Sequence, residues 1–405
     1  MNFLSFIGLM KTIYGKKLPD LARIEKKGLL AVKIAQHYAL RIDFLDDKVC
    51  AHLTKLYRHT SSIPQENIQE LIRSYTDDRW LDNFTEFNKI PFASASVGQV
   101  HEARLKNGQR VVIKVIKKDF RNNFLKDIET LEKWFRFILV FYPKLKGVFD
   151  PIGILQNIKE YTLEELDLMN EIKGQEILKK IFNENREKYD LQKLCFPVYY
   201  EDLSNSNILV SNWIEGHTFD ELIDSHSLDY SKLLDLFHIH GFYLFGPGTF
   251  HGDIHPGNII LNPEGNIYFV DSGAISHVSR KIKDGLFNFF DNLSLYDYEG
   301  SAYYLNKMAE KEIDDSSFKK YEQKFIELYS DFKNSTVSEV SLTKKMMETI
   351  KLAVNSGAVF EQGMFSIIKS MMYLDGMVLR CKPDAILLKD MRMFIGEFKK
   401  LVSEN

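Results

Sequence analysis

The spacing of hydrophobic residues divides the first half of the chain into three parts. In residues 1–75, apolar residues recur at intervals of three and four, the spacing of one face of an α-helix. Residues 91–120 instead hold two β-rich runs joined by a turn, and Asn107-Gly108 is the strongest short signal for a hairpin. Helical spacing returns in residues 121–182. We therefore predict helices, then a strand hairpin, then helices again.

The second half begins with short strands and ends in helices. Two strand-like runs, CFPVYYEDLS and NILVSNWIEG, are separated by the turn-like residues 204–207. Thr218 and Glu221 have the spacing of a capping box, which predicts a helix start, and another helix is expected over residues 231–246. After residue 279 the spacing is helical throughout, including the segments 315–333, 341–355 and 360–380 and a final helix after Pro383-Asp384. The pattern as a whole predicts an α+β protein.

Composition narrows the class of protein. The 405 residues include 53 Lys and Arg against 56 Asp and Glu, a net charge of −3, whereas a dedicated nucleic-acid binder usually has a strong basic excess. Hydrophobic residues make up 45% of the chain, which is typical of an ordered globular protein. The three cysteines are scattered and match no disulfide framework or zinc pattern, which favours a reducing, cytoplasmic location.

No apolar run approaches the ~20 residues of a membrane-spanning helix. The first residues, MNFLSFIGLMKTIYGKK, are apolar but lack the basic start and cleavage site of a signal peptide. We expect this segment to pack on the protein itself, and a helix lying on a membrane surface is the alternative. Peripheral membrane contact therefore stays open.

The densest candidate chemistry lies in the stretch HGDIHPGNIILNPEGNIYFVDSG. Asp253 and Asn258 fit D-x-x-x-x-N, the spacing in which an Asp orients a substrate hydroxyl and an Asn holds Mg²⁺. Two short apolar runs around Pro-Glu-Gly-Asn predict a β-hairpin, which would return Asp271 to the loop that the chain left. Carboxylate and amide oxygens suit Mg²⁺. We predict that Asn258 and Asp271 bind the metal and that Asp253 is catalytic.

Two simpler interpretations of this stretch exist. Asp, Asn, His and Gly are common in turns, so HGD or PGN alone is explained by loop structure. His251 and His255 could also suggest a transition metal, but no Cys lies near and the Pro-Gly disfavours a helical face. The combination of HGD, PGN and a strand ending in Asp-x-Gly is rarer than any of its parts, which favours a nucleotide-phosphate site.

The predicted hairpin of residues 91–120 holds a second set of candidates. Lys114 lies among β-branched residues in VVIKV, where a lysine is costly unless paired, and a strand-borne lysine can contact nucleotide phosphates and a helix glutamate. An edge-strand lysine that opposes aggregation is the alternative. Small residues before the first strand would let backbone N–H groups approach phosphate. These expected cofactor-binding residues are Ala93, Ser94, Ala95, Ser96, Val97 and Gly98.

Three of the acidic residues in the helical segment YTLEELDLMNEIKGQEILKK are informative: Glu165, Asp167 and Glu171. Glu171 is expected mid-helix as the partner of Lys114, although the sequence does not decide between Glu171 and Glu165. Asp167 is the third. Further on, the strand ending in Trp213-Ile214 resembles a connection between two lobes, where a nucleotide base can hydrogen-bond to the backbone.

Taken together, these segments resemble the UbiB/ADCK family of atypical protein-kinase-like proteins, which is associated with ubiquinone and isoprenoid-lipid metabolism. PFASASVGQVHEARL resembles the alanine-rich loop of that family. Lys33 and Gln36 match its KxGQ motif, which on sequence alone would be a solvated helix edge, and Glu165 with Asp167 match its ExD motif. The resemblance extends from about Gly28 to Asp384.

The resemblance implies a fold, a domain plan and ligands. We expect a bilobal kinase-like fold: residues 1–89 as a helical N-terminal extension that folds over the protein-substrate site, 90–215 as a β-rich N-lobe, and 216–405 as a helical C-lobe. Mg²⁺ and ATP or ADP are the implied ligands, and an isoprenoid or quinone-like lipid is an implied partner. The oligomeric state stays open.

Two residues of this chain differ from the motifs expected of such a kinase-like protein. Ala35 stands where KxGQ has glycine, which a helix tolerates, and Ser272 stands where DFG has phenylalanine. Losing that ring weakens any switch based on its packing, while Asp271 can still bind Mg²⁺.

Three functions are compatible with these residues. The leading one is Mg²⁺-dependent ATP hydrolysis or phosphoryl transfer. A small-molecule kinase of the aminoglycoside or choline type also has HGD and D-x-x-x-x-N, but would not be expected to carry the alanine-rich loop and the ExD motif. A nucleotide-gated lipid-binding pseudokinase is the third, and a turnover assay separates it from an enzyme.

Overall fold

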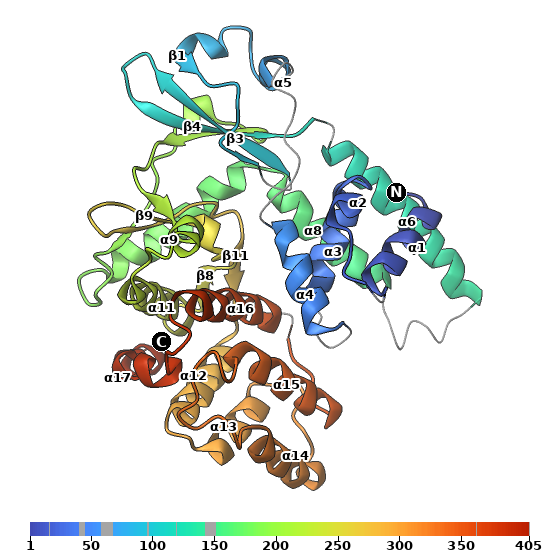
Figure 1. Ribbon diagram of the computed structural model, residues 1–405, viewed down its shortest axis with the longest axis vertical. Coiled ribbons are helices and arrows are strands. Elements are labelled where there is room, and N and C mark those ends of the chain that lie inside the picture. The colour runs from blue at the N-terminus through green and yellow to red at the C-terminus, as the bar shows by residue number, and fades with distance from the viewer. Residues whose placement is uncertain are drawn as a thin grey trace. The chain divides into compact units, whose positions relative to one another are not determined.

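The computed structural model describes residues 1–15, 17–39, 45–57, 68–94, 97–118, 120–141, 151–361 and 363–404. The chain forms two compact units (Figure 1). Unit 1 contains Met1–Ile172 and Pro197–Trp213, and unit 2 contains Lys173–Phe196 and Ile214–Asn405. The predicted boundaries after residues 89 and 215 stay a prediction.

Unit 1 holds an antiparallel sheet of five strands. They are β1 (Phe84–Phe87), β2 (Ala93–Ser94), β3 (Gly98–Leu105), β4 (Arg110–Ile116) and β6 (Ile208–Asn212), in the order β1-β3-β4-β6 with β2 beside β3. Val111, Ile113 and Val115 alternate along β4 and are fully buried, as the period of two requires. Gly108 has φ +85°, which the β3–β4 turn needs and which glycine adopts without strain. The predicted hairpin is confirmed.

Most helices of unit 1 form a second core around α3, whereas α5, η3 and η4 pack against the sheet. In chain order the helices of unit 1 are α1 (Phe3–Ile13), α2 (Leu21–Glu25), α3 (Leu29–Ala39), α4 (Asp47–Leu53), η1 (Thr54–Tyr57), α5 (Ile68–Tyr75), η3 (Trp80–Asn83), α6 (Phe120–Phe141), α8 (Pro151–Glu165), the first turn of α9 (Met169–Asn185) and η4 (Glu201–Leu203). Leu30 and Ile34 of α3 pack with Phe124 of α6 and Leu155 of α8. Leu9 and Ile13 of α1 are fully buried in the same core, so the first residues pack on the protein itself.

One predicted strand is mostly absent. Of CFPVYYEDLS, only Cys195 lies in a strand, β5 (Leu194–Cys195), and Glu201–Leu203 form a 3-10 turn. Pro197 explains the break, because proline has no N–H to donate to a sheet.

The predicted position of Glu171 was also wrong in one respect: it lies in the first turn of α9 and not in the middle of the helix.

The strands of unit 2 are short. They are β5, β7 (His217–Thr218), β8 (Thr249–His251), β9 (Ile259–Leu261), β10 (Ile267–Phe269) and β11 (Ile275–His277), with the 3-10 turn η5 (Pro256–Asn258) before β9. β9 and β10 form the predicted hairpin, with Ile267 opposite Leu261, and Gly265 takes φ +85° in its turn. β11 pairs with β8. These two pairings return the chain toward the HGD stretch.

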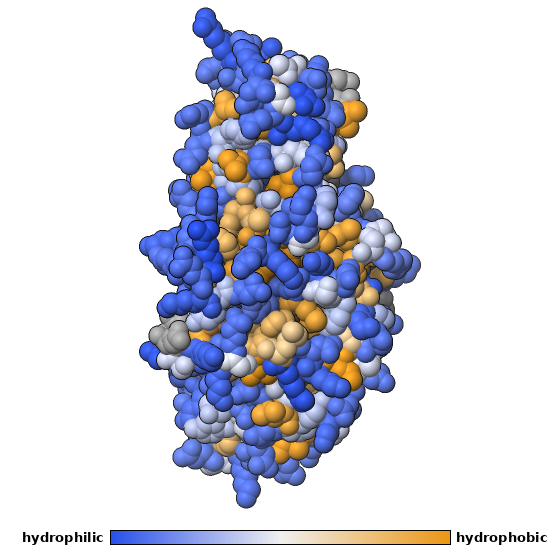
Figure 2. Space-filling model, turned by 90° about the vertical axis from the view of Figure 1, so that its left-hand side faces the viewer, coloured by the Kyte–Doolittle hydropathy of each residue, from blue (hydrophilic) through white to orange (hydrophobic). Residues whose placement is uncertain are grey.

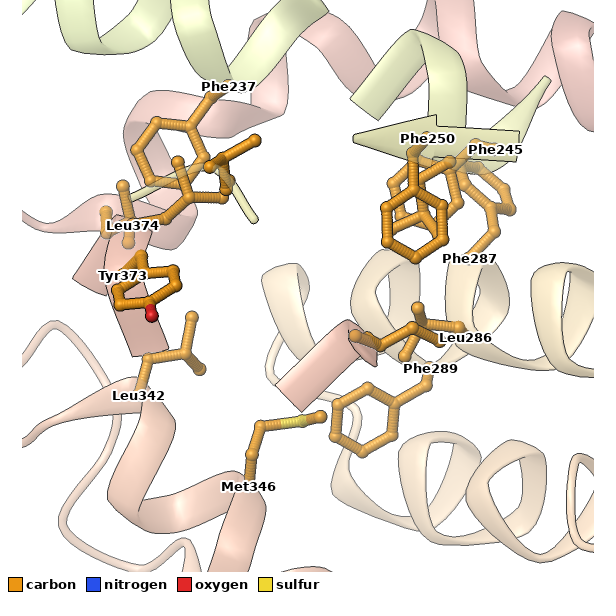
Figure 3. Close-up of a cluster of buried hydrophobic side chains, with 14 of the residues drawn as sticks. Phe237, Phe245, Phe250, Leu286, Phe287, Phe289, Leu342, Met346, Tyr373 and Leu374 are labelled. Carbon is orange, nitrogen blue, oxygen red and sulfur yellow. The ribbon is translucent and has the colours of Figure 1, made fainter. Parts of the chain in front are cut away.

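Helices make up most of unit 2. They are the rest of α9, α10 (Phe219–Asp224), α11 (Tyr230–Phe245), α12 (Arg280–Ser294), α13 (Tyr298–Lys307), α14 (Asp315–Leu328), α15 (Leu342–Asn355), α16 (Gly363–Cys381) and α17 (Leu387–Glu404). Aromatic rings fill the core between them, and Figure 3 shows Phe245 and Phe287 close together, with ring centroids 5.7 Å apart. The helical end of the chain is as predicted, and the fold is α+β.

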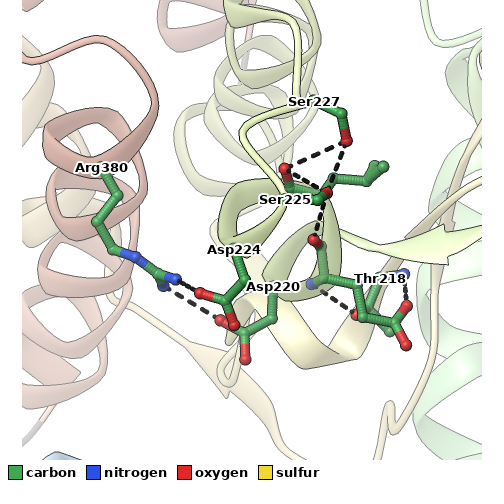
Figure 4. A network of polar contacts seen from close by, with 8 residues as sticks. Thr218, Asp220, Asp224, Ser225, Ser227 and Arg380 are labelled. Atoms are coloured by element: carbon green, nitrogen blue, oxygen red, sulfur yellow. Dashed lines mark hydrogen bonds and ion pairs between the residues drawn. The ribbon is translucent and has the colours of Figure 1, made fainter.

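Polar contacts fix the ends of α10 and α16. Thr218 and Glu221 form the predicted capping box at the start of α10. Arg380 of α16 reaches α10 and pairs with Asp220 at 3.1 Å and with Asp224 (Figure 4). Helix α16 is therefore anchored to α10 through its last turn.

The face shown in Figure 2 carries small groups of hydrophobic residues among hydrophilic ones. Scattered apolar side chains of this kind are normal on a protein surface. Within the described ranges, the structure has no helix that is both long and apolar enough to cross a membrane.

Candidate functional site

Lys114 of β4 forms a buried ion pair with Glu171 of α9. The lysine side chain is 13% exposed and the glutamate 7%. β4 presents Lys114 on the face opposite its fully buried valines and isoleucine, because side chains alternate along a strand. The sequence left open whether Glu165 or Glu171 pairs with Lys114. In the structure, Glu171 is the partner.

The small-residue loop lies next to this pair in the sheet. Ala93 and Ser94 form β2 and pair with Val100 and Gln99, while Ala95 and Ser96 lie outside the described residues. The Ser94 hydroxyl is buried, with no hydrogen-bond partner in the part of the chain that the structure describes.

The other end of the loop approaches β4 closely. Val97 is buried, and its carbonyl accepts the N–H of Lys117 at 3.0 Å. A Cβ on Gly98 would lie 2.8 Å from the Val115 carbonyl, so only glycine fits there without a shift. The backbone of Val97 and Gly98 is thus held tightly against the strand that carries Lys114.

Two buried polar residues beside the loop were not predicted. Gln99 Nε2 donates to His101 Nε2 at 2.8 Å, and His101 Nδ1 donates to the Asn88 carbonyl at 2.9 Å. Burial lowers the pKa of His101, so the ring stays neutral at physiological pH. Both lie in QVHEAR, where strand alternation could have indicated that Gln99 and His101 share one face.

The N-terminal motif residues meet the acidic ones within unit 1. Lys33 of α3 is buried and pairs with Glu165 at the end of α8. Gln36 Nε2 donates to the Leu56 carbonyl at 3.0 Å. Asp167 accepts the N–H of Met169 at 3.2 Å and so supports the start of α9. Lys33 and Gln36, 5% and 4% exposed, are not a solvated helix edge.

Trp213 and Ile214 mark the passage of the chain from unit 1 to unit 2. The Arg110 guanidinium lies 4.2 Å from the centre of the Trp213 ring, and Trp213 N donates to the Arg110 carbonyl at 3.0 Å. These contacts fix the backbone at the predicted connection.

In unit 2, the loop after β8 is held by its own side chains. Asn258 Nδ2 donates to the Asp253 carbonyl at 3.1 Å, which turns the amide oxygen away from that carbonyl. His251 Nδ1 accepts the N–H of Asp253 at 3.1 Å, and its Nε2 donates to the Val270 carbonyl at 3.2 Å. Burial lowers the pKa of His251, consistent with a neutral ring. His255 Nδ1 accepts the N–H of Gly257 at 3.0 Å. Both histidines therefore serve the loop backbone, which argues against the transition-metal alternative.

Asp271 follows β10 with a left-handed backbone, φ +56°. This conformation is strained for a residue with a side chain, and such strain is typical of functional positions. The next residue, Ser272, is fully buried, and its carbonyl would lie 1.9 Å from a Cβ on Gly174 of α9. The absence of a side chain at Gly174 therefore lets the DSG turn lie against α9.

Asp253 has a charged neighbour that sequence reasoning missed. Lys369 Nζ in α16 lies 3.1 Å from Asp253 Oδ1. Burial would raise the pKa of Asp253, but Lys369, His255 and His251 outweigh it and hold the pKa below its ordinary value. The only available signal was a lysine within the apolar run FSIIKSMM, and nothing in that run points to Asp253.

The donors in this loop fit Mg²⁺. Asn258 offers an amide oxygen and Asp271 a carboxylate, and Mg²⁺ typically takes one or two protein oxygens and completes its shell with water and substrate phosphate. The observation that supports this fit is that the Asn258 amide is held through its nitrogen, which leaves the amide oxygen as the possible metal donor.

Comparisons with known proteins indicate an atypical kinase-like protein. The family model of the ABC1 atypical kinase-like domain matches residues 55–305. The chain belongs to the ABC1 atypical kinase-like family. The predicted resemblance to UbiB proteins is confirmed, because the chain is 24% identical over 392 residues to a probable protein kinase UbiB of Erwinia tasmaniensis, covering 93% of this chain and 69% of that one.

Other relatives vary in how much of their length is matched. A Clostridium pasteurianum protein named for the hydrogenase 1 5' region is 26% identical, over 91% of this chain and 69% of its own. For the probable serine/threonine-protein kinase abkB of Dictyostelium discoideum the identity is 27%, over 76% of this chain but 46% of the relative. Rv3197 of Mycobacterium tuberculosis, solved with erythromycin, matches with a TM-score of 0.52 at 17% identity over 94% of this chain and 95% of its own, which shows the fold alone.

Proposed function

We propose that this ABC1-family protein binds Mg-ATP or Mg-ADP and catalyses ATP hydrolysis or phosphoryl transfer. The observation that carries the proposal is the hydrogen bond from Asn258 to the Asp253 backbone, which orders a D-x-x-x-x-N loop of the kinase type. The strained backbone of Asp271, just after β10, supports it.

Each site residue has a role in this proposal. Lys114, oriented by Glu171, holds the α- and β-phosphates, and the backbone of residues 93–98 approaches them. The backbone at Trp213-Ile214 binds the base. Asn258 and Asp271 hold Mg²⁺, which neutralises charge on the phosphates when bound. Asp253 orients the attacking hydroxyl or water and accepts its proton.

The buried Lys33–Glu165 pair supports a specialised member of the family and not a generic small-molecule kinase. We infer that the acceptor is water or the headgroup of a quinone-like or isoprenoid lipid, as the family resemblance implies. Contact with a membrane surface would then be peripheral.

One observation favours a second function, a nucleotide-gated lipid-binding module without turnover. Ser272 is fully buried at the position where a mobile phenylalanine would switch Asp271 in an ordinary kinase. Tight Mg-ATP binding without release of phosphate would favour the module over the enzyme.

The proposal is tested by Asp271→Asn. We expect the affinity for Mg-ATP, measured by titration calorimetry, to fall at least about 10-fold, because a metal-binding carboxylate is lost. Asp284→Asn is the matched control, since Asp284 pairs only weakly with exposed Arg280 at 3.3 Å and lies outside the site. Unchanged affinity in Asp271→Asn would show that the metal assignment is wrong.

A further inference from the structure

Helix α16 places a buried cation beside the proposed catalytic carboxylate. Lys369 is 8% exposed, and its Nζ lies 3.1 Å from Asp253 Oδ1. The same Nζ lies 5.9 Å from the centre of the Tyr373 ring, which contacts the ring of His255 edge-on at 5.2 Å. One face of α16 therefore lies on the HGDIHPGN loop.

The opposite face of α16 is mainly apolar, and its buried carboxylate, Asp375, accepts a hydrogen bond from the Ser341 hydroxyl at 2.7 Å. Ile367, Met371 and Leu374 follow helical spacing and line the hydrophobic interior of unit 2. Lys369 is two residues from Ile367 and so points to the other side of the helix. With Arg380 anchoring the last turn to α10 (Figure 4), the helix holds Lys369 in a defined place.

The stability of the fold gives little reason to bury the ion pair of Lys369 and Asp253. Burying two charges is expensive, and an apolar pair of similar volume is often as stable or more so. A second lysine shows the structural use of such a side chain: Lys283, 5% exposed, donates to the Gly246 carbonyl at 2.9 Å, just after the end of α11. Lys369 instead meets a carboxylate in the loop to which we assign the chemistry.

The loop itself supplies no permanent cation. Between Asp253 and Asn258 the sequence is Ile-His-Pro-Gly, and Nδ1 of its one titratable residue, His255, accepts a backbone N–H. Charge on a transferred phosphoryl group needs a positioned positive group near the point of attack. Lys369 is the cation that the described structure brings to this carboxylate.

We propose that Lys369 is a catalytic residue that contacts the transferred γ-phosphoryl group and stabilises its charge during transfer. This inference rests on the proposed function. In the step, the acceptor oxygen bonds to the γ-phosphorus, and the bond from that phosphorus to the β–γ bridging oxygen breaks, its electron pair leaving on ADP. The acceptor proton passes to Asp253. Lys369 stays protonated throughout.

The geometry fits this role. A base accepts a proton from an oxygen about 2.6–3.2 Å away. An ammonium group 3.1 Å from that base lies beside the attacking oxygen and so near the phosphoryl group that the oxygen attacks. The pair with Asp253 is then the resting position of Lys369 before ATP arrives.

The experiment measures hydrolysis of Mg-ATP and binding of Mg-ADP by the full chain, in the original protein and in Lys369→Met, Lys369→Gln and Lys369→Arg. We expect kcat to fall about 100-fold in the Met and Gln variants, the size of effect seen when one transition-state donor is removed. Affinity for Mg-ADP should change less than 3-fold, because ADP lacks the transferred group. Arginine should restore part of kcat.

Lys283→Met is the matched control for loss of a buried lysine. It should lower the melting temperature and leave kcat intact. If Lys369→Met does not fold, the Gln variant carries the same test. Unchanged or faster hydrolysis in either folded variant would overturn the inference and show that the pair merely restrains Asp253. If the original chain binds Mg-ATP but never releases phosphate, the proposed enzyme activity fails and this inference fails with it.

Discussion

Buried lysines are the clearest sign of selection for chemistry in single residues of this chain. Lys33 meets Glu165, Lys114 meets Glu171 and Lys369 meets Asp253. Removing one partner of such a pair leaves an uncompensated charge and costs about 3–5 kcal/mol. An apolar core without these charges would avoid that cost, so stability alone does not explain the three pairs.

A buried histidine near the site gives a prediction about pH. His240 in α11 is 4% exposed, and its ring lies edge-on to Phe250 at 5.4 Å. Burial, with a smaller effect of His251, lowers the pKa of His240 from 6.5 to about 3. Below pH 6.5 the unfolded chain therefore takes up a proton that the folded chain does not. The stability linked to neutral His240 is complete above pH 6.5 and is lost progressively as the pH falls toward 3.

We expect His240→Leu to flatten this dependence. Between pH 6.5 and 5, the free energy of unfolding of the original protein should fall by up to about 1.4 kcal/mol per pH unit more than that of the variant. Urea unfolding at several pH values measures both slopes. His217→Gln is the control, because His217 is 71% exposed. Equal slopes for the original protein and His240→Leu would contradict the prediction.

Among elements, the contact between α9 and the DSG turn is the tightest near the metal donors. A methyl group at Gly174 would overlap the Ser272 carbonyl, which is backbone and cannot rotate away. Any displacement of Ser272 also moves Asp271, its neighbour in the chain. The position of the proposed metal ligand Asp271 therefore depends on a glycine in a helix of the same unit.

Gly174→Ala should destabilise the protein by about 1–3 kcal/mol, as overpacking does. It should also weaken Mg-ATP binding, because the turn that carries Asp271 must shift. Gly376→Ala is the matched helical control: nothing lies within 4 Å of its Cβ, so alanine should be neutral or stabilising by about 0.5–1 kcal/mol. Thermal unfolding and calorimetry measure both effects. A Gly174→Ala variant with unchanged stability and affinity would show that the turn has more room than the structure gives it.

On the scale of the whole molecule, the N-terminal helices are part of the core of unit 1. Leu30, Ile34 and Leu53 are buried with residues of α6 and α8. Each such side chain contributes about 1.5–3 kcal/mol by burial, and the net stability of a domain is only about 5–15 kcal/mol. The extension is therefore a structural component of unit 1.

Deleting residues 1–57 should consequently unfold part of unit 1. We expect increased binding of a hydrophobic dye and loss of a cooperative thermal transition. Leu4→Ser tests the same region without loss of core, because Leu4 is 80% exposed, and it should behave as the original protein does. If the shortened chain were monodisperse and melted at the original temperature, the extension would be dispensable.

The sequence by itself determined the local structure and the set of residues that indicate phosphate chemistry. Both hairpins follow from turn residues such as Gly108 and Gly265, and the α10 start from Thr218 and Glu221, because these signals act within a few residues. The HGD, PGN and DSG residues indicated phosphate chemistry for the same reason: residue types and short spacings are visible in one dimension. The hydrophobic pattern predicted one strand across Pro197. Proline has no N–H to donate to a sheet, so the strand is broken there.

Only the tertiary structure decided which charges meet. Lys33 and Glu165 are 132 positions apart, and Lys114 and Glu171 are 57 apart, so no local spacing specifies these pairs. Lys369 could be assigned to Asp253 only after α16 was packed against the loop, since an isolated lysine in a helix is normally solvated. Burial and long-range contact are properties of the folded chain, and they turn these lysines from ordinary surface charges into the candidate machinery of the site.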